Sequence, residues 1–150
     1  MQKTQMSAVL LDVNVLIALL WPAHEDHQRA QTWFGQNAGT GWATCPFTQA
    51  AFVRIVSNPA FSRDAVTPKE ALNLLATNVR HKAHQFWADE IDLVSAVWPF
   101  VVRLSGHQQV TDAYLLGLAR HKKGKLGTLD RTISELLPDK NMEASYLVLI

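Results

Sequence analysis

Cysteine is almost absent from this sequence, since Cys45 is the only one among 150 residues. A single cysteine excludes an internal disulfide framework and is typical of proteins from a reducing compartment. An excess of charge of one sign is lacking too, because 14 Lys and Arg residues against 13 Asp and Glu residues give a net charge of +1. The net charge alone therefore does not require a nucleic-acid partner.

Long hydrophobic runs are also missing. The most apolar stretch, residues 8–20, is interrupted by Asp12 and Asn14, and it is far shorter than the roughly 20 residues of a membrane span. Lys3 before this stretch resembles the start of a signal peptide, but the two polar residues inside it argue against that interpretation. With 48% apolar and 18% charged residues, the composition is typical of a globular protein. We predict a single cytoplasmic domain over residues 1–150.

Short apolar segments alternate with helical patterns along the chain. The first segment, residues 8–11, has no polar residue, as expected for a strand that is buried on both faces of a parallel sheet. We expect further strands at 41–45, 84–87, 125–129 and 146–150, and helices at 13–20, 24–34, 46–57, 68–79, within 93–104, at 107–123 and at 133–137. This alternation predicts an α/β fold in which helices cover both faces of a parallel sheet.

Three carboxylates stand outside any run of charge. Asp12 follows the first strand, Asp112 falls in the first turn of a helix, and Asp130 follows the strand at 125–129. In a parallel sheet such strand ends and helix starts meet at one edge, where ligands bind. Converging carboxylates repel one another, and a bound cation removes the repulsion. Oxygen ligands with several retained waters are typical of Mg²⁺ or Mn²⁺, and such an ion can activate water for phosphodiester hydrolysis.

A structural interpretation competes with this one. Asp12 would cap the helix that follows it, Asp112 would be an ordinary acid at a helix N-terminus, and Asp130 would be a turn residue. This interpretation is adequate for each residue alone and weaker for the three together.

Four segments resemble the PIN-domain ribonucleases. They are LLDVNVLIAL near the N-terminus, WATCPFTQAAFVRIVSNP in the middle, and HQQVTDAYLLGLA and TLDR late in the chain. The closest resemblance is to the VapC-type toxins of bacterial toxin–antitoxin pairs. It implies a PIN-like three-layer α/β/α sandwich with a central, mostly parallel sheet. It also implies metal-dependent RNA cleavage, with tRNA as one candidate substrate, inhibition by a cognate VapB-type antitoxin, and a homodimer.

The same resemblance assigns roles to individual residues. Family acids match Asp12, Asp112 and Asp130 in this chain. Asp12 and Asp112 would bind the Mg²⁺ or Mn²⁺ ion, and Asp130 would complete the catalytic site directly or through water. Asn14 and Thr128 match polar positions that orient these acids without binding metal.

Gln49 departs from the family pattern. It lies in the first turn of the predicted helix 46–57, at a position where the family usually has Glu. An amide oxygen can accept a hydrogen bond or bind a cation, but it brings no charge and cannot act as a base. We therefore expect weaker metal binding and slower cleavage. An alternative is a PIN-fold binding module that has lost activity through Gln49 and still binds antitoxin or RNA.

A phosphatase of the dehalogenase-like kind is a further alternative, in which Asp12 would be the nucleophile. That chemistry needs a second acid two residues later, and Asn14 in this chain cannot donate a proton as an acid does. The sequence therefore favours the nuclease over the phosphatase.

Basic residues gather late in the sequence. We predict that Arg120, Lys122, Lys123 and Arg131 lie near the acids and bind RNA phosphates. The alternative is that these side chains are ordinary solvated residues of helix ends and loops.

Overall fold

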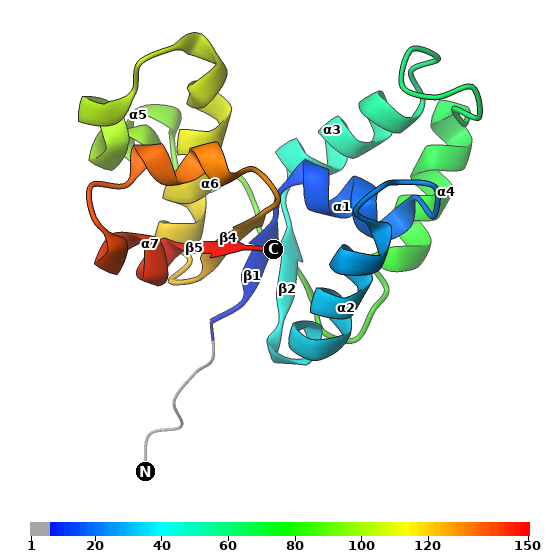
Figure 1. Ribbon diagram of the computed structural model, residues 1–150, viewed down its shortest axis with the longest axis horizontal. Coiled ribbons are helices and arrows are strands. Elements are labelled where there is room, and N and C mark those ends of the chain that lie inside the picture. Colours follow the sequence, from blue (N-terminus) through cyan, green and yellow to red (C-terminus); the bar gives the residue numbers. More distant parts are fainter. Residues whose placement is uncertain (1–6) are drawn as a thin grey trace.

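The computed structural model describes residues 7–150, so Lys3 of the signal-peptide interpretation lies outside the described residues. Within this part of the chain, five parallel strands form one sheet in the order β3-β2-β1-β4-β5 (Figure 1). The strands are short, and they are β1 (Val9–Leu11), β2 (Trp42–Thr44), β3 (His84–Phe86), β4 (Lys125–Thr128) and β5 (Leu147–Leu149).

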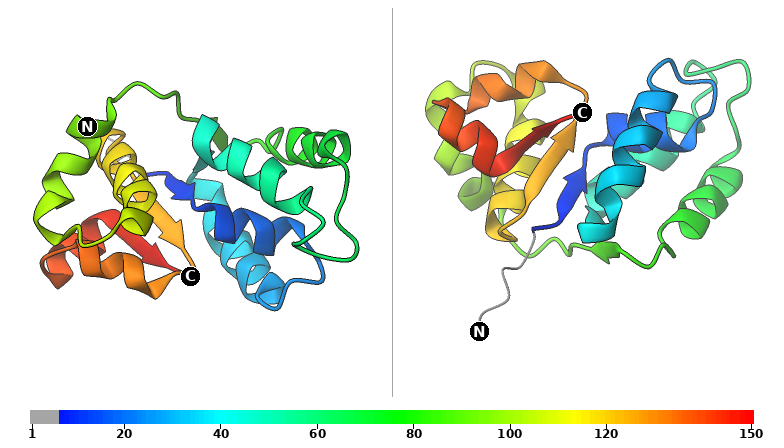
Figure 2. Two further views of the ribbon diagram at one scale, coloured as in Figure 1. Left: turned by 90° about the horizontal axis from the view of Figure 1, so that it is seen from above. Right: turned by 60° about the horizontal axis from the view of Figure 1, so that its bottom comes forward.

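Helices cover both faces of the sheet, which makes three layers (Figures 1 and 2). One face carries α1 (Val13–Leu20), α2 (His27–Asn37), α3 (Pro46–Val56) and α4 (Pro68–Asn78). The other face carries α5 (Leu93–Val97), α6 (Val110–His121) and α7 (Lys140–Tyr146). Short 3-10 helices lie at Ala38–Thr40, Trp98–Arg103, His107–Gln109 and Arg131–Leu136. The predicted α/β/α architecture is therefore confirmed.

The continuous apolar sequence of β1 is explained by burial on both faces. Leu10 packs into one core together with Leu116 of α6, whereas Val9 and Leu11 pack into the other core together with Phe52 of α3. Successive side chains of a strand point to opposite faces, so a central strand needs apolar residues at every position.

The order of the strands creates a switch point between β1 and β4. The chain moves from β1 to β2 and β3 on one side, and then it crosses back to place β4 on the other side of β1. Leu11 pairs with Gly127 in this register. Ligands of open α/β sheets bind at such a switch point, outside the carboxyl ends of the strands.

Helices α5 and α6 touch through their backbones at Gly117. A Cβ atom added at Gly117 would lie 2.0 Å from the carbonyl oxygen of Ala96. Only glycine therefore permits this close contact, which fixes α6 against α5 on the second face of the sheet.

Two local predictions differ from the structure. Helix α7 was not among the predicted helices, since no helix was expected between the one at 133–137 and the strand at 146–150. Instead, Asp139 starts a new helix by accepting a hydrogen bond from the Met142 backbone N–H at 2.9 Å. The helix expected within 93–104 is divided: α5 ends at Val97, and a 3-10 helix that contains Pro99 follows it, because proline cannot continue an α-helical hydrogen-bond ladder.

Among residues 7–150, none of the helices combines the length and the apolar character that crossing a membrane requires.

Candidate active site

Asp12 lies at the carboxyl end of β1, and its side chain is only 6% exposed. Its backbone N–H donates to the carbonyl oxygen of Gly127 on β4 at 2.9 Å. Its Oδ1 accepts a hydrogen bond from the Val13 N–H at 2.7 Å, so Asp12 also caps α1. Burial raises the pKa of this carboxyl, while hydrogen bonds from Thr128 and Val13 oppose that rise.

Thr128 and Asn14 connect Asp12 to the end of β4. The Thr128 hydroxyl donates to Asp12 Oδ2 at 2.9 Å and accepts from Asn14 Nδ2 at 3.1 Å and from the Asp130 backbone N–H at 3.0 Å. Asn14 Oδ1 accepts from the Leu129 backbone N–H at 3.1 Å. One donated and two accepted bonds use the whole hydrogen-bonding capacity of a hydroxyl. The orientation of the Asp12 carboxylate is therefore fixed from both strands.

Asp112 and Asp130 complete a group of three acids at this edge. Asp112 lies in the first turn of α6 and is half-buried. Burial first, and then the charges of Asp12 and Asp130, raise the pKa of Asp112 to about 6. Asp130 Oδ1 accepts hydrogen bonds from the Thr132 N–H at 2.9 Å and from the Thr132 hydroxyl at 2.7 Å. The structure therefore places three carboxylates within each other's electrostatic field.

The donor set of this edge fits a hard divalent cation that keeps most of its water. No three His, Cys, Asp or Glu side chains within residues 7–150 come close enough together to enclose a metal ion by themselves. Mg²⁺ is commonly held by only one or two carboxylates together with waters and substrate phosphates. Asp12 and Asp112 could supply those two carboxylates, because a carboxylate has about four lone pairs and Asp12 Oδ1 accepts only the Val13 bond.

Gln49 stands in the first turn of α3, directly after β2. Its Nε2 donates to the hydroxyl of Thr44 at 2.9 Å, and this hydroxyl lies 2.7 Å from Nε2 of His84 on β3. Thr44 and His84 did not stand out in the sequence as site residues, because 40 residues separate them. A polar residue facing inward at the start of a helix was the available signal, and it pointed to Gln49 alone.

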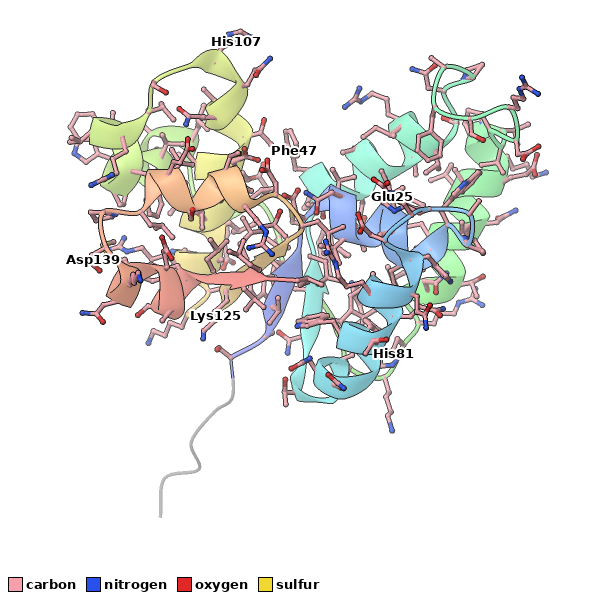
Figure 3. The ribbon with its side chains drawn as sticks, viewed as in Figure 1. Glu25, Phe47, His81, His107, Lys125 and Asp139 are labelled. Carbon is pink, nitrogen blue, oxygen red and sulfur yellow. The ribbon has the colours of Figure 1, made fainter. Side chains whose placement is uncertain are left out.

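Most of the basic residues that were expected near the acids lie far along α6 from Asp112. Arg120 is in the last turn of α6, and Lys122 and Lys123 follow that turn, eight or more residues after Asp112, which is about 12 Å or more along a helix axis. Lys125 begins β4 and lies at the edge of the sheet away from Phe47 in the first turn of α3 (Figure 3).

Two of the basic residues have distinct surroundings. Lys122 forms an ion pair with Glu90, which lines the hollow described below. Arg131 directly follows Asp130 at the carboxyl end of β4. Proximity in sequence to Asp130 does not bring the basic residues at the end of α6 to the acids, because β4 runs from the amino end to the carboxyl end of the sheet between them.

A hollow of about 820 Å³ opens at the start of α6, and no pattern in the sequence indicated it. It is assembled from the start of α3, the segment before α5 and the start of α6, with the lining residues Pro46, Phe47, Asp89, Glu90, Ile91, Asp92, Leu93, Val110, Thr111 and Tyr114. Thr111 adjoins Asp112 in the chain, but neighbouring helix residues point in different directions, and Asp12, Asp112 and Asp130 are not among the lining residues.

Comparisons with known proteins agree with this geometry. A family model described as "PIN domain" matches residues 9–136. The chain is 43% identical over 127 residues to a protein named Ribonuclease VapC38 from Mycobacterium tuberculosis, covering 85% of this chain and 88% of that protein. It is 40% identical over 125 residues to Ribonuclease VapC44 of the same species, covering 83% of this chain and 87% of that protein.

A solved structure shares the fold. The crystal structure of VapBC2 from Rickettsia felis, bound to a DNA fragment from their promoter, superposes with a TM-score of 0.61. It covers 95% of this chain and 98% of that chain at 10% sequence identity. The family model and the relatives match most of this chain, and the strand order and the acids at the switch point of the sheet agree with them. The chain therefore belongs to the PIN-domain family, among the VapC ribonucleases.

Proposed function

We propose that this protein is a metal-dependent endoribonuclease toxin that hydrolyses RNA phosphodiester bonds and is neutralised by a cognate VapB-type antitoxin. The observation that carries the proposal is the group of Asp12, Asp112 and Asp130 at the switch point of the sheet, in a chain related to named ribonucleases. The protein with the shared fold is named as a VapBC assembly, which supports an antitoxin as partner.

In this proposal Asp12 and Asp112 hold a Mg²⁺ or Mn²⁺ ion. When bound, such an ion holds a phosphate oxygen and lowers the pKa of a coordinated water. Thr128 and Asn14 keep the Asp12 carboxylate in one orientation through the hydrogen bonds described above. Asp130, anchored by Thr132, completes the acidic edge on the side of β4.

The RNA would approach along the edge that carries these acids. Arg131 is the basic residue placed to contact a phosphate close to the scissile bond, because it directly follows Asp130. Arg120, Lys122 and Lys123 lie toward the far end of α6 from Asp112, so they would contact phosphates away from the scissile bond, and Lys122 is held by Glu90 at the hollow. The hollow lined by Thr111 offers space for a nucleotide at the start of α6, with the half-exposed ring of Phe47 at its wall.

The decisive experiment is cleavage of a mixed pool of structured RNAs by protein freed from antitoxin. Reactions contain Mn²⁺, Mg²⁺ or a chelator, and Asp112→Asn is purified in parallel so that any contaminating nuclease appears in both preparations. Asp64→Asn is the matched control, because this exposed acid lies on the loop before α4. We expect discrete products from wild type and Asp64→Asn with metal, and none from Asp112→Asn or with chelator.

Two results would refute the proposal. Products that persist with chelator or in Asp112→Asn would exclude metal chemistry at this edge. The absence of products from folded wild-type protein would favour a PIN-fold binding module, and the same assay with Gln49→Glu would then show whether the missing charge is the reason.

A further inference from the structure

A chain of hydrogen bonds joins Gln49 to the edge strand β3. Gln49 Nε2 donates to the hydroxyl of Thr44 at 2.9 Å, and the same oxygen lies 2.7 Å from Nε2 of His84. Thr44 ends β2 and is completely buried, and His84 begins β3 and is half-buried. Two neighbouring strands and the first turn of α3 therefore meet at a single hydroxyl.

The chemistry of these groups and the acceptors within reach favour one direction for each bond. An amide nitrogen can only donate, and a hydroxyl has one proton. Thr44 accepts from Gln49, and its hydroxyl could accept from His84 as well only if its own proton had another acceptor. Within residues 7–150, His84 Nε2 is the one acceptor within hydrogen-bond distance of this hydroxyl besides the donor Gln49. We therefore assign the Thr44 proton to the bond with His84, whose Nε2 is then unprotonated. A backbone hydrogen bond with Val79 raises the pKa of His84, as an acceptor on the ring does. A proton on Nδ1 satisfies both neighbours at once.

The surroundings of His84 hold the ring in place and keep it neutral. The ring packs edge-on against Trp42, with centroids 4.7 Å apart, and Trp42 is buried. Trp42 Nε1 donates in turn to Nδ1 of His81 at 3.2 Å. Burial first, and the neighbouring His81, lower the pKa of His84.

We propose that His84 is a positioning residue for Gln49, acting through the Thr44 hydroxyl. The unprotonated Nε2 of His84 accepts a hydrogen bond from the Thr44 hydroxyl, whose oxygen then accepts from the amide nitrogen of Gln49. The amide oxygen is then the end of the side chain that faces away from Thr44, where it can accept a hydrogen bond from water or RNA. This use of Gln49 rests on the proposed function, whereas the direction of the hydrogen bonds does not.

Glu at position 49 would require the opposite arrangement. A carboxylate only accepts, so the Thr44 hydroxyl would donate to it and would then accept from a protonated Nε2 of His84. The present chain and its Gln49→Glu variant should therefore contain different protonation states of His84, even though this ring does not touch residue 49.

Nitrogen-15 NMR of the His84 ring tests the inference without any RNA. At neutral pH we expect a proton on Nδ1 and none on Nε2 in the wild type, and a protonated Nε2 in Gln49→Glu. Thr40→Val is the matched control, because the Thr40 hydroxyl bonds only locally to the Asn37 carbonyl oxygen, and it should leave the His84 signals unchanged. A wild-type ring protonated at Nε2, or the same state in both proteins, would overturn the proposal.

Cleavage kinetics test whether this positioning matters for the reaction. Thr44→Val keeps the shape of the side chain but removes the hydroxyl, and we expect kcat to fall about five- to tenfold with little change in KM. Thr44→Ser, which restores the hydroxyl, should return kcat to near the wild-type value. Equal kcat for Thr44→Val and wild type would overturn the positioning role. If the wild type cleaves no RNA, the proposed function fails, and the NMR result still decides the direction of the bonds.

Discussion

Replacing Asp112 with Asn should make the metal-free protein more stable at neutral pH, although this residue is central to the proposed activity. Burial and the charges of Asp12 and Asp130 raise the pKa of Asp112 from its usual 3.8 to about 6. This rise corresponds to about 3 kcal/mol of unfavourable free energy in the ionised form. Because the side chain is only half-buried and solvent screens its charge, we expect about 1–2 kcal/mol of stabilisation in Asp112→Asn.

The dependence on pH gives this prediction a direction. Between about pH 4 and pH 6 the folded protein binds a proton at Asp112 that the unfolded chain has released. Stability therefore falls as the pH rises through this interval and levels off above it. In Asp112→Asn this contribution disappears, so the difference in stability between the two proteins should grow from about pH 4 to about pH 6 and then stay constant.

Urea unfolding in the presence of chelator, repeated between about pH 4.5 and pH 7.5, measures both quantities. Asp64→Asn removes an exposed acid and controls for the change in net charge. Addition of Mn²⁺ should stabilise the wild type more than Asp112→Asn, because only the wild type keeps both proposed ligands. If Asp112→Asn is no more stable than wild type at neutral pH, or shows the same slope with pH, the electrostatic account of this edge is wrong.

Three further changes test the site and the fold. Thr128→Val should lower the free energy of unfolding by about 1–3 kcal/mol in urea unfolding, because it leaves the buried Asp12 carboxylate without its hydroxyl donor, and a Thr128→Ser variant as unstable as Thr128→Val would contradict this explanation. Gly117→Ala should destabilise by at least about 1–3 kcal/mol, because the added methyl meets the Ala96 carbonyl oxygen; Gly35→Ala, where a Cβ meets nothing within 4 Å, is the control and should not lower Tm. Gln49→Glu should bind Mn²⁺ more tightly in a titration, because it adds a negative charge near the proposed ligands, and unchanged affinity would show that residue 49 does not contribute to the ion site.

Local signals made much of the fold predictable from sequence. The helix predicted at 68–79 begins at Pro68 with a capping box, in which the Thr67 hydroxyl accepts from the Glu70 N–H at 3.1 Å while the Glu70 carboxylate accepts in return. The fully apolar β1 and the isolated Asp12 behind it likewise showed a central strand with a buried acid at its end. Each of these patterns lies within a few consecutive residues, which is why sequence alone was sufficient.

Contacts between distant segments could not be predicted in the same way. The hydroxyl of Thr44 meets His84 only because β2 and β3 are neighbours in register, and neither residue is unusual in its own segment. The basic residues illustrate the opposite case, because Lys123 is close to Asp130 in sequence while β4 lies between them. Each residue of a helix or a strand advances the chain by about 1.5 Å or 3.3 Å, so residues that are close in sequence can lie at opposite ends of the sheet.

The arrangement around Asp12 shows how a buried acid can remain a candidate metal ligand. Burial favours the protonated form, which cannot bind a cation well, whereas the donors from Thr128 and Val13 favour the ionised form. Asp112 has no comparable donor in the described structure, and its pKa is raised by burial and by its acidic neighbours. Ion binding would therefore need to displace a proton from Asp112 more than from Asp12, so metal affinity should rise steeply through pH 6.

A neutral Gln49 at the same end of the sheet limits the repulsion among the acids, because a further carboxylate would raise the pKa of its neighbours again in the absence of metal. The weaker ion binding expected from Gln49 and a more stable metal-free protein are thus two consequences of the same missing charge.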